Sequence, residues 1–194
     1  MEIVNCSIYN DKKETEEIFK FLDNLEIEYH KEYKVFGKIR KVPRGQASFT
    51  LDKEIHYNYK VAGGSPINVV MCDKLKEITT RVNKTLNTNF NSILLNKYKD
   101  GLDYISYHKD KTDGWKEGTG VATLSFGCER DFNIKCIETQ KVTKILHKDG
   151  SVLYMPYPMN DHYQHSVPKR VKCKDCRISL TFREMATEKV KEKI

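Results

Sequence analysis

The sequence has 194 residues, 39% of them hydrophobic and 10% aromatic, which is enough for one domain with a sizeable buried core. Its formal net charge of +7 favours a polyanionic partner, although charge alone identifies none. No apolar run approaches the roughly twenty residues that cross a bilayer, and the N-terminus lacks the basic and apolar regions of a signal peptide. We therefore expect a soluble, intracellular protein that does not act at a membrane.

The six cysteines are scattered through a chain of ordinary size. This pattern favours reduced thiols over disulfides. A structural zinc at Cys173-x-x-Cys176 would need two further ligands, and the sequence offers no second pair. We expect these two residues to be ordinary thiols on a loop.

Residues 10–26 read as an amphipathic helix, because Ile18, Phe19, Leu22 and Leu25 recur at helical spacing. A second helix is predicted after the turn at residues 63–66. There Ser65 would cap the helix and Pro66 would take its first position. Apolar residues then continue at three- and four-residue spacings, namely Val70, Leu75, Ile78, Val82 and Leu86.

Between the two helices, residues 31–44 carry six Lys or Arg and one acid, interleaved with Tyr33, Phe36 and Pro43. Basic side chains can neutralise phosphates, and an aromatic residue at a hairpin tip can insert between bases. The alternative is a charged hairpin that is simply solvated.

After residue 91 the chain changes to short β-rich segments separated by turns. The predicted strands are residues 92–98, 104–107, 121–126, 131–137, 141–146, 151–155, 162–165 and 176–183, with Asp149-Gly150 as a hairpin turn. Eight such strands predict a mainly β protein with flanking helices (α+β), whose core is a double-stranded β-helix, that is, a cupin-like jelly-roll. Nothing in the sequence justifies dividing residues 1–194 into two domains.

His108 and Asp110 form a His-x-Asp pair at the second of these strands. On an extended chain, residues two apart point to the same side, so both side chains could bind one metal. Two imidazoles and one carboxylate on one face of a metal are the open ligand set of non-heme Fe(II) oxygenases. His-x-Asp alone is a weak signal, and the third ligand must come from another strand.

The last predicted strand alternates polar and apolar residues, which places Arg177 and Arg183 on one face of a half-buried strand. Guanidinium stays charged when buried and matches carboxylates in a two-pronged geometry, so two inward arginines require a dicarboxylate or two protein acids. The alternative is that both arginines are exposed and paired with nearby acids.

Together these residues form an ordered pattern: Asn96-x-Tyr98, His108-x-Asp110, His165 and then Arg177 with Arg183. In this pattern the chain resembles the AlkB-like Fe(II)/2-oxoglutarate dioxygenases. The resemblance implies His108, Asp110 and His165 as catalytic metal ligands, with Fe(II), 2-oxoglutarate and O2 as the cofactor and co-substrates. It implies 2-oxoglutarate contacts at Leu94, Asn96, Tyr98, Ile105, Arg177, Ser179 and Arg183, where Ser179 replaces an Asn of the family pattern.

The same resemblance extends to the basic segment, which is similar to the nucleotide-recognition lid of members that act on duplex DNA. It implies an N-terminal extension with a lid over residues 1–66, a helix with the jelly-roll core over 67–186, and a frayed tail over 187–194. Substrate contacts are implied at Phe36, Arg44, Tyr57, Tyr59, Thr112 and Asp113. Phe36 would fill the gap left by a flipped base, and Thr112 stands where the family places an acid.

The activity implied by the resemblance is oxidative dealkylation of bases such as 1-methyladenine and 3-methylcytosine in alkylated DNA. It would release formaldehyde, succinate and CO2 from a base flipped into the site. An RNA demethylase and a 2-oxoglutarate-dependent hydroxylase of a protein or small molecule remain alternatives, as does a non-catalytic nucleic-acid-binding module. We expect a monomer.

The remaining histidines are assigned no role. His30 and His56 lie in polar surroundings, and His147 beside the predicted turn should be solvated. His162 lies three residues before His165, so an extended chain would turn it to the opposite face.

Overall fold

The computed structural model describes residues 2–29, 32–35, 38–55 and 68–187. The large sheet contains β1 (Val4–Ser7), β4 (Gly45–Thr50), β5 (Asn68–Val70), β6 (Ser92–Tyr98), β8 (Val121–Gly127), β11 (Ser151–Met155) and β13 (Arg177–Arg183), in the order β1-β11-β8-β13-β6-β4-β5. The small sheet contains β7 (Ile105–His108), β9 (Arg130–Cys136), β10 (Val142–His147) and β12 (Tyr163–Val167), in the order β10-β9-β12-β7. A hairpin of β2 (Glu32–Val35) and β3 (Lys38–Lys41) forms a separate pair.

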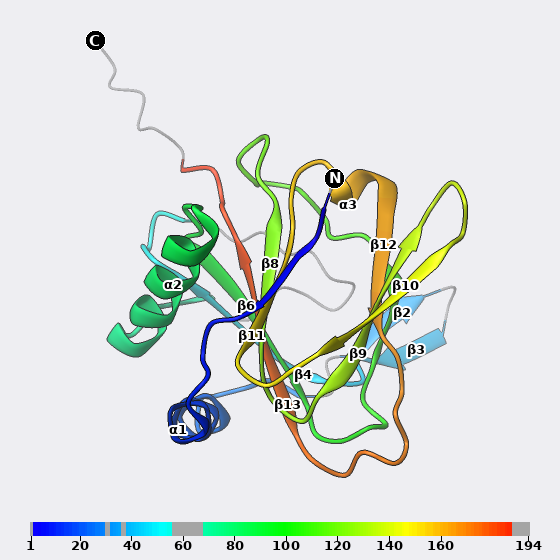
Figure 1. The fold of residues 1–194 in the computed structure, drawn as a ribbon, viewed down its shortest axis with the longest axis horizontal. Helices are drawn as coiled ribbons and strands as arrows, with labels where there is room; N and C mark the ends of the chain where they lie inside the picture. Colours follow the sequence, from blue (N-terminus) through cyan, green and yellow to red (C-terminus); the bar gives the residue numbers. More distant parts are fainter. Residues whose placement is uncertain (1, 30–31, 36–37, 56–67, 188–194) are drawn as a thin grey trace.

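The described residues also form the helices α1 (Lys12–Asp23), α2 (Asp73–Leu86) and the short α3 (Met159–His162). Figure 1 shows α1 and α2 on one side of the molecule and the small sheet on the other, with the large sheet between them. The architecture is therefore a two-sheet jelly-roll with helices on its outer face, which confirms the predicted fold class.

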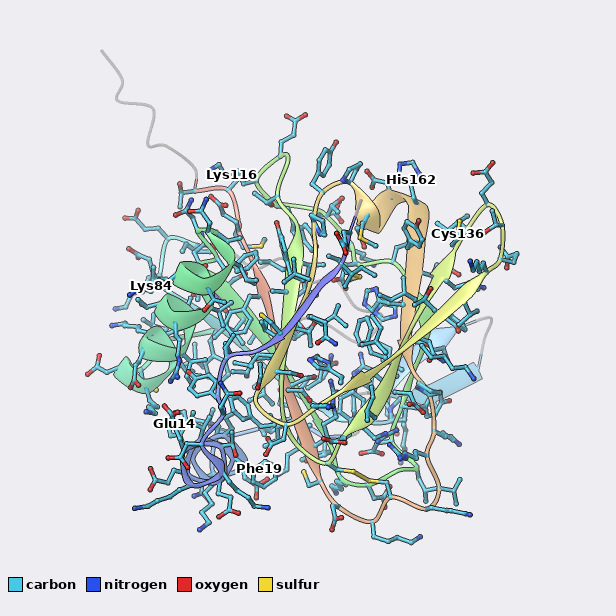
Figure 2. All side chains as sticks on the ribbon, viewed as in Figure 1. Glu14, Phe19, Lys84, Lys116, Cys136 and His162 are labelled. Atoms are coloured by element: carbon cyan, nitrogen blue, oxygen red, sulfur yellow. A yellow bond between two sulfur atoms is a disulfide. The ribbon has the colours of Figure 1, made fainter. Side chains whose placement is uncertain are left out.

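The long helices are amphipathic and bury their apolar stripe on the large sheet. In α1, Asp11 caps the helix by accepting a hydrogen bond from the Lys13 backbone N–H, and Ile18 and Leu22 are buried. Figure 2 shows Phe19 on α1 and Lys84 on the outer side of α2. A second apolar cluster, which includes Phe132, lies on the small-sheet side.

Strand β13 is central to the large sheet, between β8 and β6. Ile178, Leu180 and Phe182 belong to the core shared with the helices. The alternate residues Arg177, Ser179, Thr181 and Arg183 line a pocket together with residues of the small sheet. The strand was predicted to be half-buried, but all seven of its residues are buried, because the second sheet covers its polar face.

In the N-terminal part, two strands were not predicted and one helix prediction is wrong in detail. Strands β1 and β4 were not predicted, yet β1 pairs with β11 and β4 pairs with β6. The second helix begins at Asp73 with Cys72 at its N-cap, while Val70 lies in β5. The expected helix start at Ser65 and Pro66 lies outside the described residues.

The expectation that all cysteines are reduced thiols is also wrong. Cys128 and Cys173, 45 residues apart, form a disulfide. The connection from β12 to β13 brings Cys173 beside the β8–β9 turn, where the Cys128 backbone N–H also donates to the carbonyl of Cys176 at 2.9 Å. Spacing along the sequence gave no sign of this contact, since it depends on the path of a long loop.

None of the helices in the described ranges is long and apolar enough to cross a membrane.

Candidate metal centre

Backbone pairing places the three predicted ligands together. Strand β12 pairs antiparallel with β7 so that His165 lies opposite His108, and their ring centroids are 4.3 Å apart. Directly opposed residues in a ladder point to the same face of a sheet. Asp110 follows two residues after His108, just beyond the end of β7. The ligand atoms of all three side chains lie within 4.8 Å of one another.

The protonation state of the histidines suits metal binding. The Nδ1 atom of His108 lies 2.9 Å from the Ser106 carbonyl oxygen, which can only accept, so Nδ1 carries the proton and Nε2 keeps its lone pair. Burial lowers the pKa of His108 and lowers that of His165 to about 3. Both imidazoles are therefore neutral at pH 7. The ring of Phe132 stacks on His165 with 5.3 Å between centroids and fixes its plane.

Asp110 is a buried carboxylate with one oxygen paired and one free. Burial alone would raise the pKa of Asp110, but the Arg183 guanidinium, with Nη2 3.1 Å from Oδ1, and the two imidazoles lower it to about 2. The other oxygen, Oδ2, has no hydrogen-bond partner within the described part of the chain. Since an unsatisfied buried carboxylate oxygen is costly, its position beside two imidazole lone pairs fits a divalent cation.

The pocket behind this centre is strongly positive. It is lined by the three candidate ligands and by Arg44, Leu94, Asn96, Tyr98, Ile105, Thr123, Phe132, Val167, Arg177, Ser179, Thr181 and Arg183. Three guanidiniums therefore face a pocket whose only carboxylate among these lining residues is that of Asp110. Such a pocket requires an anionic ligand, and its apolar residues Leu94 and Ile105 suit an aliphatic chain.

Arg177 presents a free donor to this pocket. Its Nε donates to Ser125 Oγ at 2.9 Å and its Nη2 to His147 Nδ1 at 3.3 Å. The third nitrogen, Nη1, is buried and has no partner among the described residues. Burial lowers the pKa of Arg177 to about 10, so the guanidinium remains charged at pH 7. A buried cation with an unpartnered N–H is suited to a carboxylate ligand.

Neighbouring polar residues fix the wall of the pocket. Asn96 Oδ1 accepts hydrogen bonds from Arg44 Nε at 2.8 Å and from Gln46 Nε2 at 3.0 Å. The structure thus places Arg44, a predicted substrate contact, against a predicted 2-oxoglutarate contact. Gln46 was not predicted, because it lies on the unrecognised strand β4. Ser179 lies opposite Asn96 in the ladder between β13 and β6.

The other predicted substrate contacts are not brought together in the described ranges. Phe36, Tyr57 and Tyr59 lie outside the described residues. Thr112 and Asp113 are exposed on the loop after Asp110. The same loop carries Trp115, whose ring lies under the Arg183 guanidinium at 5.4 Å; sequence reasoning gave this residue no role.

His147 is another residue that sequence reasoning missed, and its predicted exposure is wrong. Its side chain is 0% exposed, with Nε2 3.1 Å from the Ser151 carbonyl oxygen and its ring edge-on to Phe132. Since Nε2 donates to that carbonyl, Nδ1 is free to accept from Arg177. On β10 only Ile145 and His147 turn inward, but the apolar Leu146 between them hides this alternation in the sequence, and the adjacent turn suggested solvent.

A groove of about 520 Å3 lies beside the metal centre and shares Arg44, Ile105 and His108 with its pocket. It is lined by Ile39, Lys41, Pro43, Arg44, Tyr104, Ile105, Ser106, Tyr107 and His108. The groove therefore runs between hairpin strand β3 and β7, which is an outer strand of the small sheet. On the β7 side, Lys135 Nζ lies 4.6 Å from the Tyr107 ring centroid and Lys169 Nζ lies 4.8 Å from that of Tyr104.

This fold and site define an Fe(II)- and 2-oxoglutarate-dependent dioxygenase. A model of the 2OG-Fe(II) oxygenase superfamily matches residues 7–183, which contain all three candidate ligands and both strand β13 arginines. The chain belongs to this superfamily and, by the relatives that follow, to its AlkB-like family.

The chain is 34% identical over 198 residues to "DNA oxidative demethylase ALKBH2" of Bos taurus, covering 95% of this chain and 70% of the bovine protein. It is 33% identical to the protein of the same name from Homo sapiens, covering 97% and 76%. It is also 29% identical over 140 residues to "Alpha-ketoglutarate-dependent dioxygenase alkB homolog 3" of Rattus norvegicus, covering 67% and 47%. The solved structure titled "The structure of OsALKBH1" shares the fold, with a TM-score of 0.64 at 15% identity over 94% of this chain and 97% of that one.

Proposed function

We propose that this protein repairs alkylated DNA by oxidative demethylation of N-alkylated bases such as 1-methyladenine and 3-methylcytosine. The observation that carries the proposal is one pocket that contains an oxygen of Asp110 and an N–H of Arg177, neither of which has a partner among the described residues. The DNA oxidative demethylases named above, which match nearly the whole chain, support the substrate class.

The residues divide the binding of iron and 2-oxoglutarate between the two ends of the pocket. His108, Asp110 and His165 would hold Fe(II), and their neutral imidazoles and ionised carboxylate are the forms that bind metal. Arg183 would hold the carboxylate of 2-oxoglutarate next to the iron, and Arg177 with Tyr98 and Asn96 the distal one. When bound, iron and 2-oxoglutarate supply O2 activation and oxidation of the N-alkyl carbon, with succinate, CO2 and formaldehyde as products.

The groove between β3 and β7 provides the path for a base. A base inside a duplex cannot reach the metal, so it must be extruded at a cost of a few kcal/mol. Tyr104 and Tyr107 offer aromatic surfaces along the groove, and Lys41, Lys135 and Lys169 offer positive charge for the phosphates. The basic hairpin of β2 and β3 would act as the nucleotide-recognition lid, with Phe36 as the residue that fills the gap in the duplex. In that case Phe36→Ala slows repair of duplex DNA and spares single strands.

A panel of methylated oligonucleotides tests the proposal. DNA and RNA, single-stranded and duplex, each carrying 1-methyladenine or 3-methylcytosine, would be incubated with the protein, Fe(II) and 2-oxoglutarate. The products would be measured by mass spectrometry together with succinate and formaldehyde. We expect demethylation of DNA, and none with the His108→Ala variant.

The same panel separates the alternatives. Equal or faster demethylation of RNA would identify an RNA demethylase. Succinate release that does not respond to methylated nucleic acid would identify a hydroxylase of a protein or small molecule. Binding of DNA that is unchanged in His108→Ala, with no formaldehyde from any substrate, would identify a non-catalytic binding module.

A further inference from the structure

The side chain of Asn160 holds the backbone of a metal ligand at two points. Its Oδ1 accepts from the Asp110 backbone N–H at 2.9 Å, and its Nδ2 donates to the Asp110 carbonyl oxygen at 2.9 Å. One primary amide thus satisfies both backbone groups of one residue, as a neighbouring β-strand would do. The two residues are 50 positions apart in the sequence, and no motif connects them.

Asp110 needs such support because the sheet does not supply it. Strand β7 ends at His108, and the last pairing of β7 with β12 is His108 with His165. Asp110 therefore lies in irregular backbone at the start of the loop to β8. Arg183 fixes the carboxylate of Asp110 but not its main chain.

Asn160 itself is anchored in the protein. It belongs to α3, the single helical turn that leads into β12 and so to His165. The preceding residue Met159 is 2% exposed and donates its backbone N–H to the Pro156 carbonyl at 2.8 Å. The amide of Asn160 consequently ties the segment that carries the second ligand to the segment that leads to the third.

We propose that Asn160 is a positioning residue of the metal centre, which sets the place of the Asp110 carboxylate relative to the two imidazoles. The proposal concerns the iron site alone and holds whatever the substrate is. Partners behind the ligands of a metal commonly change its affinity about 10- to 100-fold when they are removed. Loss of the Asn160 amide should therefore weaken metal binding before any substrate is present.

The chain contains a matched control for this contact. Asn83, in α2, makes the same pair of hydrogen bonds to the backbone of Phe90. Its Nδ2 donates to the Phe90 carbonyl oxygen at 2.9 Å, and its Oδ1 accepts from the Phe90 backbone N–H at 2.8 Å. Phe90 belongs to the apolar core shared with the helices and lines no part of the metal pocket. Asn83→Ala removes the same pair of hydrogen bonds, together with one from Thr88 Oγ1 at 3.0 Å, away from the metal pocket.

The experiment compares Asn160→Ala, Asn160→Gln, Asn83→Ala and Asp161→Ala, the last being an exposed residue of the same helical turn. Co(II) is titrated by calorimetry into the metal-free protein without nucleic acid. The visible spectrum of the Co(II) complex is recorded, and thermal unfolding of each metal-free variant measures the effect on folding. We expect a Co(II) Kd about 10- to 100-fold higher and an altered spectrum for Asn160→Ala, an intermediate Kd for Asn160→Gln, and values within twofold of the parent for both controls.

Two outcomes would overturn the proposal. One is a Co(II) affinity and spectrum of Asn160→Ala equal to those of the parent protein, which would make the contact purely structural. The other is an equal loss of affinity in Asn83→Ala, which would make the loss a general result of lower stability. If Asn160→Ala does not fold, Asn160→Ser, which keeps one hydrogen-bonding group, carries the same comparison. If the parent protein bound Co(II) but demethylated no nucleic acid, the substrate proposal would fail and this one would stand.

Discussion

At the scale of single residues, the three nitrogens of Arg177 have three different tasks. Two of them bind Ser125 and His147, and the third is left for a ligand. A guanidinium held on two sides loses little further freedom when a carboxylate arrives, so the site is preorganised. His147 is neutral and accepts a hydrogen bond from Arg177 through Nδ1. It therefore holds the guanidinium in place without neutralising the positive charge that the ligand needs.

Replacement of His147 should therefore weaken the binding of 2-oxoglutarate more than it changes the rate of catalysis. In His147→Leu the Nη2 atom of Arg177 loses its acceptor, and we expect the KM for 2-oxoglutarate to rise about tenfold with a small change in kcat, as for one lost hydrogen bond to a charged group. Succinate release measured against 2-oxoglutarate concentration gives both constants. His162→Leu, at the exposed residue labelled in Figure 2, is the control. An unchanged KM in His147→Leu would contradict this role.

The same histidine should make the stability of the protein depend on pH. Burial and the nearby Arg177 lower the pKa of His147 from 6.5 to about 3. Below pH 6.5 the unfolded chain binds a proton at this imidazole that the folded chain does not bind, so the free energy of unfolding falls as the pH falls. The contribution is complete above about pH 6.5, and between about pH 6 and 4 its slope is up to about 1.4 kcal/mol per pH unit. Urea unfolding of the metal-free protein at several pH values gives this dependence. The free energy of unfolding should change less steeply with pH in His147→Gln than in the parent, and an equal dependence on pH would refute the assignment.

At the scale of secondary-structure elements, alternation along the strands was the strongest signal in the sequence. It placed Arg177 and Arg183 of β13 on one face, while β-rich composition gave β6 and β11 with their observed bounds. Period-two spacing depends only on the extended backbone, so it can be seen without tertiary structure.

Strand β4 shows what alternation could not reveal. Its polar residues Gln46, Ser48 and Thr50 are all buried, and Gln46 finds its hydrogen-bond partner on β6. From the sequence a polar residue is expected to be exposed unless its hydrogen-bond partner is known. The partner of Gln46 is Asn96, fifty residues away in the sequence. His147 and Asn160 were missed for the same reason, because their roles depend on contacts with Arg177 and Asp110 that only the fold creates.

The outer strand β7 offers a test of the substrate groove. Stacking of a base on an aromatic ring contributes about 1–3 kcal/mol, so Tyr107→Ala should weaken binding of a methylated single-stranded oligonucleotide about 5- to 150-fold. Fluorescence anisotropy measures this affinity, and succinate release without nucleic acid should remain as in the parent protein. Lys84→Ala, on the outer side of α2, is the control (Figure 2). Equal affinities of Tyr107→Ala and the parent would place the nucleic acid elsewhere.

At the scale of the whole molecule, iron and 2-oxoglutarate would bind between the two sheets. The pocket between them brings together the guanidiniums of Arg44, Arg177 and Arg183 with the carboxylate of Asp110. Iron and 2-oxoglutarate should bind the folded protein and not the unfolded chain, so both should stabilise the folded state by mass action.

Metal and co-substrate should therefore raise the thermal midpoint in separate steps. At 100 times its Kd a ligand adds about 2.7 kcal/mol, equal to about 5–10 °C for a domain of this size. Scanning calorimetry without O2 should show one rise with Mn(II) and a further rise with 2-oxoglutarate. Arg177→Met should keep the first and lose most of the second. A full 2-oxoglutarate response in Arg177→Met would contradict the assignment of Arg177 to the co-substrate.

His165 lies opposite His108 in the ladder between β12 and β7. Because of this alignment, the chain should tolerate inserted residues in loops but not in these two strands. An insertion of one residue within either strand would turn an imidazole to the opposite face of the sheet and destroy the iron site in a single event. Insertions in the loops at 111–120 and 168–176 leave the alignment intact. Changes of length during the divergence of such proteins are therefore expected in those two loops, where they can alter contacts with the substrate while the oxidation chemistry is inherited unchanged.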